Sequence, residues 1–87
     1  MYSVELSEWA MDDLGRLNQL EIELALEIFY ELEIDPVPDD ARPYVIPEAA
    51  DGVGYRLERS NLMIYYNIFE LAKLVKVVEV ERKQSLN

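Results

Sequence analysis

Four cationic side chains in the last third of the chain are the candidates for chemistry: Arg56, Arg59, Arg82 and Lys83. Guanidinium and ammonium groups gathered on one face of a sheet can stabilise negative charge that develops on oxygen atoms. Such a reaction also needs a group that takes and returns a proton, and the chain has no histidine for that role. A tyrosine, a lysine or a carboxylate would have to replace it. Charged strand residues are more often solvated surface, and we favour that interpretation here.

The segment that must position these cations predicts three antiparallel strands. Apolar and charged residues alternate in its first part, and the middle part is almost wholly apolar and aromatic. The third part is rich in valine, which favours strands. The predicted strands are Tyr55–Arg59, Leu62–Ile68 and Leu74–Val80, and the predicted turns are Ser60–Asn61 and Phe69–Lys73.

The first 34 residues predict a strand and two helices. Residues Met1–Leu6 alternate as a strand does, and Ser7 is placed to cap a helix that ends or bends at Asn18. Residues Leu20–Ile34 predict the second helix. We expect the first helix to bury Trp9, Ala10, Leu14 and Leu17. On the second helix, Ile22, Ala25, Leu26, Phe29 and Leu32 should be buried opposite Glu23, Glu27 and Glu31, and Leu24 and Ile28 widen this apolar stripe.

Prolines interrupt the chain between the helices and the strands. Asp35–Pro38 ends the second helix, and Tyr44–Ile46 is a short edge strand or an extended loop segment. The order β–α–α–loop–β–β–β predicts an α+β domain that spans residues 1–87, with a helical hairpin packed on one antiparallel sheet. The polar residues 84–87 are expected to fray.

Composition limits the function. The 87 residues carry a net charge of −10, with −12 in residues 1–51 and +2 in residues 52–87. The first half should repel nucleic acid, so a polyanion would have to meet the sheet. The acid pairs Asp12–Asp13 and Glu79–Glu81 lack the spacing of a calcium loop, and we predict no metal and no cofactor. The chain has no cysteine, no signal peptide and no membrane span, and we expect a cytoplasmic protein.

Aromatic and apolar residues near the predicted turn suggest a surface for a protein partner. Neighbouring strand residues point to opposite faces, so one of Tyr65 and Tyr66 should be core and the other surface. Phe69 and Leu71 lie in a turn, where apolar side chains are exposed. We therefore predict that Tyr65, Phe69 and Leu71 bind a partner.

Three segments resemble the RelE/ParE toxin superfamily. Residues Tyr2–Leu14 resemble that family's opening strand and helix, in which a strand ends in Leu-Ser and an acidic-Leu pair follows. Residues Tyr55–Arg59 with Leu62–Asn67 resemble its paired "Tyr-Arg" strands. Residues Val77–Lys83 look like its final strand, which runs into a basic patch. With its net charge of −10, the chain would be an atypical acidic member.

The resemblance implies two chemistries. RelE-like members are similar to ribosome-dependent ribonucleases that use sheet cations, whereas ParE-like members bind DNA gyrase, and an antitoxin silences both. The chain can be aligned with the family's "Tyr-Arg" pair in two registers. In one register Leu62–Met63 matches the pair, so Met63 takes the arginine position, and Glu58 stands where the preceding strand of the family has a base or cation. In the other register Arg56 is retained, and the strand before it comes from Pro43–Ile46. The family's C-terminal tyrosine has no counterpart after Lys83.

Three functions remain open at this point. We rank first a RelE/ParE-like toxin, or a non-catalytic relative of one, in a type II toxin–antitoxin system that acts mainly by protein binding. A RelE-like messenger RNA endoribonuclease is second, because −10 opposes an approach to RNA. An acidic interaction module or nucleic-acid mimic is third. The expected partners are an antitoxin that presents a basic or apolar helix, a protein target, or a second copy paired through the Met1–Leu6 or Leu74–Val80 strand.

Overall fold

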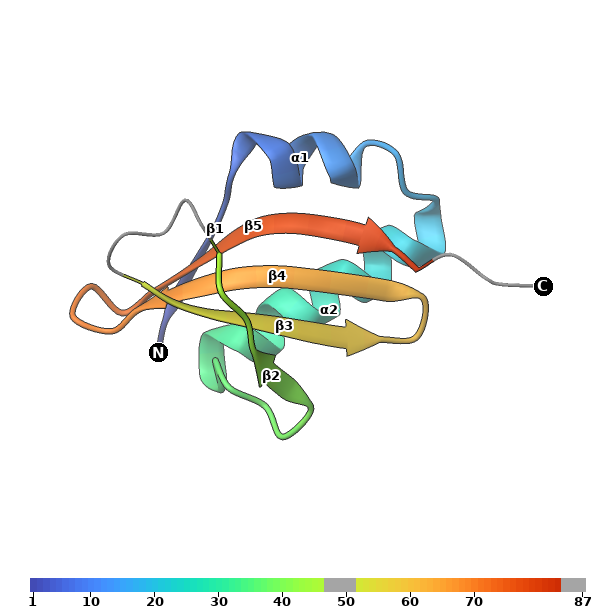
Figure 1. Cartoon of the computed structure of the whole chain (residues 1–87). Coiled ribbons are helices and arrows are strands. Elements are labelled where there is room, and N and C mark those ends of the chain that lie inside the picture. The colour runs from blue at the N-terminus through green and yellow to red at the C-terminus, as the bar shows by residue number, and fades with distance from the viewer. Residues whose placement is uncertain (47–51, 84–87) are drawn as a thin grey trace.

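The computed structural model describes residues 1–46 and 52–83 as one α+β unit (Figure 1). Its elements are β1 (Ser3–Leu6), α1 (Glu8–Leu14), α2 (Gln19–Ile34), β2 (Ala41–Pro43), β3 (Val53–Arg59), β4 (Leu62–Phe69) and β5 (Leu74–Arg82). The predicted order of one strand, two helices and three consecutive strands is confirmed. In the described part of the chain, no helix is long and apolar enough to cross a membrane.

The five strands form one sheet in the order β1-β5-β4-β3-β2. Strands β3, β4 and β5 make the predicted antiparallel meander, and the Ser60–Asn61 turn joins Arg59 to its partner Leu62. Ser60 has a φ of 52°, in the left-handed region that a tight hairpin turn requires. The edge strand β2 lies at Ala41–Pro43, so of the two alternatives for Tyr44–Ile46 the extended loop segment is confirmed and the edge strand was wrong.

Strand β5 is an interior strand, and the prediction that Leu74–Val80 offers a free edge was wrong. Strand β1 pairs with it in parallel, from Ser3 opposite Leu74 to Leu6 opposite Val77. Beyond Leu6, the cap and the first helix α1 contact the rest of β5. The Ser7 hydroxyl donates to the carbonyl of Val78 at 2.7 Å. The Asp13 carboxylate accepts the backbone N–H of Val80 at 3.0 Å. The free edges of the described sheet are therefore β1 and β2.

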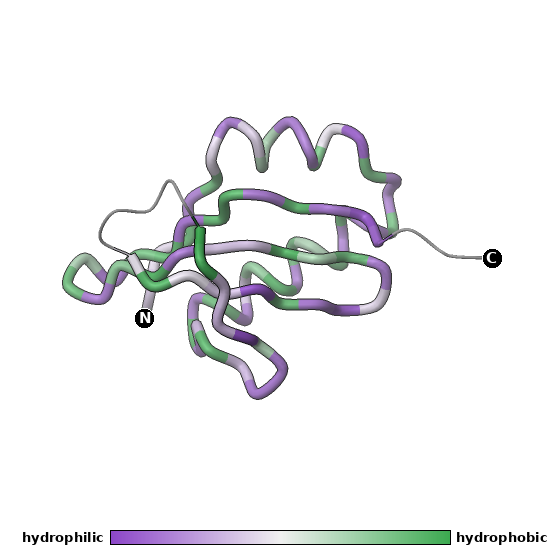
Figure 2. Tube along the Cα trace, in the orientation of Figure 1, coloured by the Kyte–Doolittle hydropathy of each residue, from purple (hydrophilic) through white to green (hydrophobic). Residues whose placement is uncertain are grey.

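Helix α2 lies across one face of the sheet and encloses the core (Figure 1). The buried helical residues pack against fully buried residues of the three long strands. The core cluster is Ala10, Ala25, Ile28, Phe29, Leu32, Ala41, Leu57, Leu62, Ile64, Tyr66, Ile68, Val75, Val77 and Val80. Figure 2 shows the corresponding apolar segments of the trace. We call this side of the sheet the helix face and the other side the open face.

Three of the five residues predicted to be buried on α2 are buried, but the buried side is turned slightly about the helix axis. Ile28 is buried, whereas Leu26 is exposed and Ile22 is only half-buried. Glu31 was expected among the solvated acids, but it accepts hydrogen bonds from Arg59 of β3. Apolar residues surround this helix on most sides, so spacing alone could not decide which of them faces the sheet.

The start of α2 is fixed by Asn18, which caps this helix and does not end the first one. The Asn18 side chain accepts the N–H of Glu21, and the Glu21 carboxylate accepts the N–H of Asn18, each at 2.9 Å. Glu21 is buried and also accepts hydrogen bonds from Arg82 and Asn61. The Arg82 guanidinium, with these other donors, lowers the pKa of Glu21 to about 2. One carboxylate thus joins α2 to the end of β5 and the β3–β4 turn.

Residues 44–46 cross the open face after β2. The backbone N–H of Tyr44 donates to the carbonyl of Gly54 at 2.9 Å, and Ile46 is only 7% exposed. A Cβ atom at Gly54 would lie 2.1 Å from the carbonyl oxygen of Tyr44. Only glycine allows the two backbones to approach so closely at this position.

Candidate functional site

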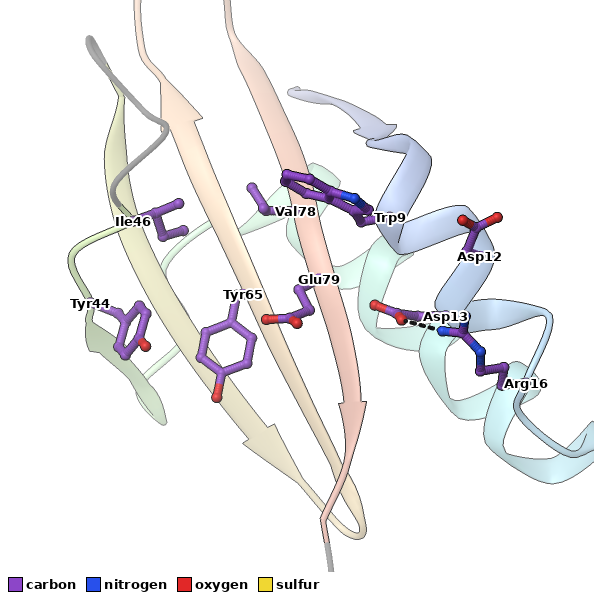
Figure 3. Close-up of a pocket in the computed structure, with 9 residues that line it drawn as sticks. All are labelled: Trp9, Asp12, Asp13, Arg16, Tyr44, Ile46, Tyr65, Val78 and Glu79. Carbon is purple, nitrogen blue, oxygen red and sulfur yellow. Dashed lines mark hydrogen bonds and ion pairs between the residues drawn. The ribbon is translucent and has the colours of Figure 1, made fainter.

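A groove with a volume of about 450 Å³ lies on the open face, between α1 and residues 44–46 (Figure 3). Strands β4 and β5 form its floor, and helix α1 forms one wall. The lining residues are Trp9, Asp12, Asp13, Arg16, Tyr44, Ile46, Tyr65, Val78 and Glu79. It combines aromatic rings with several carboxylates, and it is the candidate site.

Helix α1 places Trp9 on the wall of the groove. Ser7 caps this helix as predicted, because its hydroxyl accepts the N–H of Ala10 at 3.0 Å. Ala10 is fully buried, and its small side chain lets α1 approach the sheet closely. Trp9 is 61% exposed, so the prediction that it belongs to the core was wrong. Trp9 precedes Ala10 by one position, so its side chain points about 100° away from that of Ala10, toward the open face.

Two tyrosines form the aromatic part of the groove. The rings of Tyr44 and Tyr65 lie 4.9 Å apart between centroids at an interplanar angle of 56°. The Tyr65 hydroxyl donates to the Glu81 carboxylate at 3.4 Å. Burial and the nearby Glu81 raise the pKa of Tyr65, which keeps its phenol protonated at neutral pH. Tyr65 is therefore poorly suited to accept a proton from a substrate.

The charged residues that line the groove are mostly acidic. Asp12, Asp13 and Glu79 contribute carboxylates, and Arg16 is the cation among the lining residues. Arg16 pairs with Asp13 at 3.2 Å (Figure 3). Anionic substrates would meet repulsion here, whereas a cationic side chain would be attracted. Among the described residues no group of three or more acids could hold a metal ion.

Two of the four candidate cations face the helices and are ion-paired there. The Arg59 guanidinium donates to Glu31 and, at 2.7 Å from Nε, to Asp40. These carboxylates raise the pKa of Arg59 above its already high value. Arg82 donates to Glu21 at 2.6 and 2.7 Å. Both side chains link secondary-structure elements to one another and point away from the groove.

The other two candidate cations lie on the open face. Arg56 is half-buried and is the cross-strand partner of Tyr65, and its side chain makes no hydrogen bond or ion pair with another described residue. The Lys83 ammonium lies 2.6 Å from the Glu58 carboxylate. The four side chains therefore do not converge on one face, as a cationic catalytic cluster would require.

The residues predicted to bind a partner are spread along β4 and the turn that follows it. Tyr65 lines the groove on the open face and Tyr66 lies in the core, so the two point to opposite faces as predicted. Tyr65 is nevertheless buried, so the prediction that one of them is a surface residue was wrong. Phe69 is half-buried at the end of β4. Leu71 is fully exposed in the β4–β5 turn. Only Tyr65 lines the groove, and Phe69 and Leu71 lie outside it.

The strand register bears on the position of Arg56. Strand β2 precedes β3 and pairs with it, with Arg42 opposite Arg56 and Pro43 opposite Tyr55. The alternative that retains Arg56 requires a preceding strand from Pro43–Ile46, and β2 overlaps that range only at Pro43. Glu58 and Met63, which the other register invokes, are direct cross-strand partners on β3 and β4.

Sequence reasoning missed most of the groove. Trp9 was assigned to the core, and Tyr44 and Ile46 were treated only as an edge strand or loop. Asp12, Asp13 and Glu79 were considered as metal ligands and rejected in that role, and no groove was foreseen around them. The two glycines at 52 and 54 before an alternating strand were the available signal, since a glycine within a strand indicates a close backbone approach.

The fold is that of RelE toxins. The chain superposes on the archaeal RelE of the RelE–RelB complex from Pyrococcus horikoshii with a TM-score of 0.81 and 20% identity, covering 98% of each chain. It matches the toxin–antitoxin complex RelBE2 from Mycobacterium tuberculosis with a TM-score of 0.80 and 19% identity, covering 94% of this chain and 98% of the other. The isolated E. coli RelE toxin gives 0.74 and 16%, over 100% and 89%.

The likeness lies in structure and not in sequence. No protein-family model matches the chain, and no curated protein matches it significantly. At 16–20% identity the structures show a shared fold, and the chemistry must be argued from the residues of this chain.

Proposed function

We propose that this chain is a RelE/ParE-like toxin, or a non-catalytic relative of one, in a type II toxin–antitoxin system, and that it acts mainly by protein binding. The observation that carries the proposal is the likeness to the P. horikoshii RelE over 98% of both chains. Two of the similar structures are complexes of a toxin with its antitoxin.

The charges of the chain support binding over RNA cleavage. Arg59, Arg82 and Lys83 are each ion-paired with a carboxylate, and the groove itself is acidic. Arg56 would have to stabilise a phosphoryl transition state without their help. A net charge of −10 also slows association with ribosomal RNA and weakens it.

The proposed partners follow from the same charges. A cognate antitoxin-like protein or a protein target would meet this chain through basic or apolar groups. A nucleic-acid partner is disfavoured by the net charge. A homodimer paired through the free edge of β1 is the remaining assembly that we propose. We also propose that the protein acts in the cytoplasm.

The experiment is induced expression in a bacterium, with growth, messenger RNA integrity and plasmid supercoiling followed together. Arg56→Ala is the variant that separates the two chemistries, because the Arg56 side chain makes no hydrogen bond or ion pair with another described residue. Lys76→Ala is the matched control, since Lys76 is also an open-face cation but lies away from Tyr65.

Growth arrest with intact messages, equal in the wild type and Arg56→Ala, would support the proposal. Altered supercoiling in the same cells would identify a gyrase-type target. Messenger RNA that is cleaved in cells with the wild type and Lys76→Ala, but intact with Arg56→Ala, would replace the proposal with the ribonuclease alternative. Normal growth with a folded, soluble protein would show that the chain is not toxic, and the proposal would be reduced to a non-catalytic relative of the toxins.

A further inference from the structure

Helix α2 carries a second apolar side that faces away from the core. Leu26, Tyr30 and Ile34 are 44%, 67% and 76% exposed. They are spaced four residues apart, so they lie on one side of the helix, one above another. Val37, just beyond the end of the helix, is also exposed. We call Leu26, Tyr30 and Ile34 the outer stripe.

The outer stripe is not explained by the packing of the chain. Ala25, Ile28 and Leu32 already supply the contacts of α2 with the sheet. Single exposed apolar residues are ordinary, but three in one row over more than two helical turns form a continuous surface. The stripe spans about 12 Å along the helix axis, which matches two to three turns of a second helix.

Carboxylates border the outer stripe. Glu23, Glu27 and Glu33 lie three or four residues from Leu26, Tyr30 or Ile34 along α2. In the described part of the chain these three carboxylates are in no ion pair, unlike Glu31, which is paired with Arg59. No described cation therefore pairs with this border, and the border defines the chemistry of what can cover the stripe.

We propose that the outer stripe of α2 is the docking surface for an amphipathic helix of a protein partner whose apolar side is flanked by lysine or arginine. The apolar rows of the two helices would pack against each other, and the partner's cations would pair with Glu23, Glu27 and Glu33. Apolar contact gives affinity, and the carboxylate border selects a basic partner over an acidic one.

A second copy of this chain fits the surface poorly. Two outer stripes in contact would bring two sets of unpaired carboxylates together, and each copy carries a net charge of −10. An anionic membrane surface is disfavoured for the same reason. Charge complementarity therefore points to a basic helix from a different protein.

This surface is separate from the open-face groove, because α2 covers the helix face of the sheet (Figure 1). The inference rests on the proposed function only where it takes the partner helix to belong to an antitoxin-like protein. The docking chemistry can be tested without toxicity, so its failure and that of the proposed function are distinguishable.

The test is binding of a fluorescein-labelled 18-residue peptide to the full chain, followed by fluorescence anisotropy. The peptide has leucines at helical positions i, i+4, i+7 and i+11, flanked by lysines and arginines. A scrambled peptide of the same composition controls for general attraction to an acidic protein. We expect the amphipathic peptide to bind at least tenfold more tightly than the scrambled one.

The variants Tyr30→Ser and Ile34→Ser should each weaken binding of the amphipathic peptide about tenfold. Neither changes the charge, and both alter exposed side chains, so the fold should survive. Met11→Ser is the matched control, because Met11 is also an exposed apolar residue, 61% exposed on α1. Glu27→Gln should weaken binding less and reduce its dependence on salt.

Equal binding of the scrambled peptide would overturn the inference. So would an unchanged affinity in both Tyr30→Ser and Ile34→Ser. Sedimentation of the chain alone provides the remaining outcome: a dimer that Ile34→Ser dissociates would assign the outer stripe to a second copy and refute the basic partner.

Discussion

Replacing Gly54 by alanine should detach residues 44–46 from the sheet. The added Cβ would lie 2.1 Å from the Tyr44 carbonyl oxygen, 3.2 Å from Asn67 Oδ1 and 3.3 Å from Ile46 Cγ1. Contacts below 3.0 Å are essentially never seen for a Cβ atom, so the Tyr44 backbone would have to move by about 1 Å or more. That backbone is tied to Gly54 itself by a hydrogen bond, and no side-chain rotation can relieve the overlap.

The cost can be estimated from the contacts that would be lost. The hydrogen bond from Tyr44 to Gly54 contributes about 1 kcal/mol, and the ring contact between Tyr44 and Tyr65 contributes about 1 kcal/mol. Burial of Ile46 contributes about 2 kcal/mol. Full detachment would therefore remove about 4 kcal/mol from the roughly 5–15 kcal/mol typical of a folded domain.

Urea denaturation monitored by circular dichroism would measure this loss as a lower midpoint at an unchanged slope. The fluorescence of Trp9, the only tryptophan, would report separately on the groove that it shares with Tyr44 and Ile46. Gly15→Ala is the matched control, because Gly15 has helical backbone angles and its nearest atom would be 3.3 Å away. A Gly54→Ala protein as stable as the wild type, with unchanged Trp9 emission, would refute the reasoning.

Three further predictions concern stability. Ser60→Gly should stabilise the chain by about 0.5–1 kcal/mol in urea, because Ser60 has a φ of 52° that glycine adopts without strain. Tyr66→Phe should destabilise it by about 1–2 kcal/mol, since the buried tyrosine hydroxyl donates to the Pro36 carbonyl at 2.7 Å. The pKa of Glu21 is lowered to about 2 from 4.5, so its stabilising contribution is complete above pH 4.5 and is lost as the pH falls toward 2. Thermal melts between pH 5 and pH 2 should therefore show a steeper loss of stability in the wild type than in Glu21→Gln.

The local parts of the fold were predictable from the sequence. The alternation of Tyr55–Arg59 and the apolar run of Leu62–Ile68 place two strands correctly, because side chains alternate between the two faces of a sheet. Ser7 is also placed correctly as the cap of α1, since its hydroxyl accepts a hydrogen bond from the helix. Each of these features depends on residues within a few positions of one another.

The parts that could not be predicted depend on distant residues. The parallel pairing of β1 with β5 joins positions about seventy residues apart, and no periodicity records it. The orientations of Trp9 and Leu26 depend on how each helix is rotated against the sheet. The groove needs α1, residues 44–46 and the strands to be assembled first, so its lining was not recognisable in the sequence.

The ion pairs decide how mutations of the candidate cations must be interpreted. Arg59 joins α2 to Asp40 before β2, and Arg82 joins the start of α2 to the end of β5. Removing either cation leaves a carboxylate without its partner and weakens the fold, so a loss of toxicity in Arg59→Ala would not by itself indicate catalysis. Arg56 has no such partner among the described residues, so Arg56→Ala should leave the urea midpoint nearly unchanged. Activity that falls in Arg56→Ala at an unchanged midpoint would therefore be the one result that assigns chemistry to a cation of this sheet.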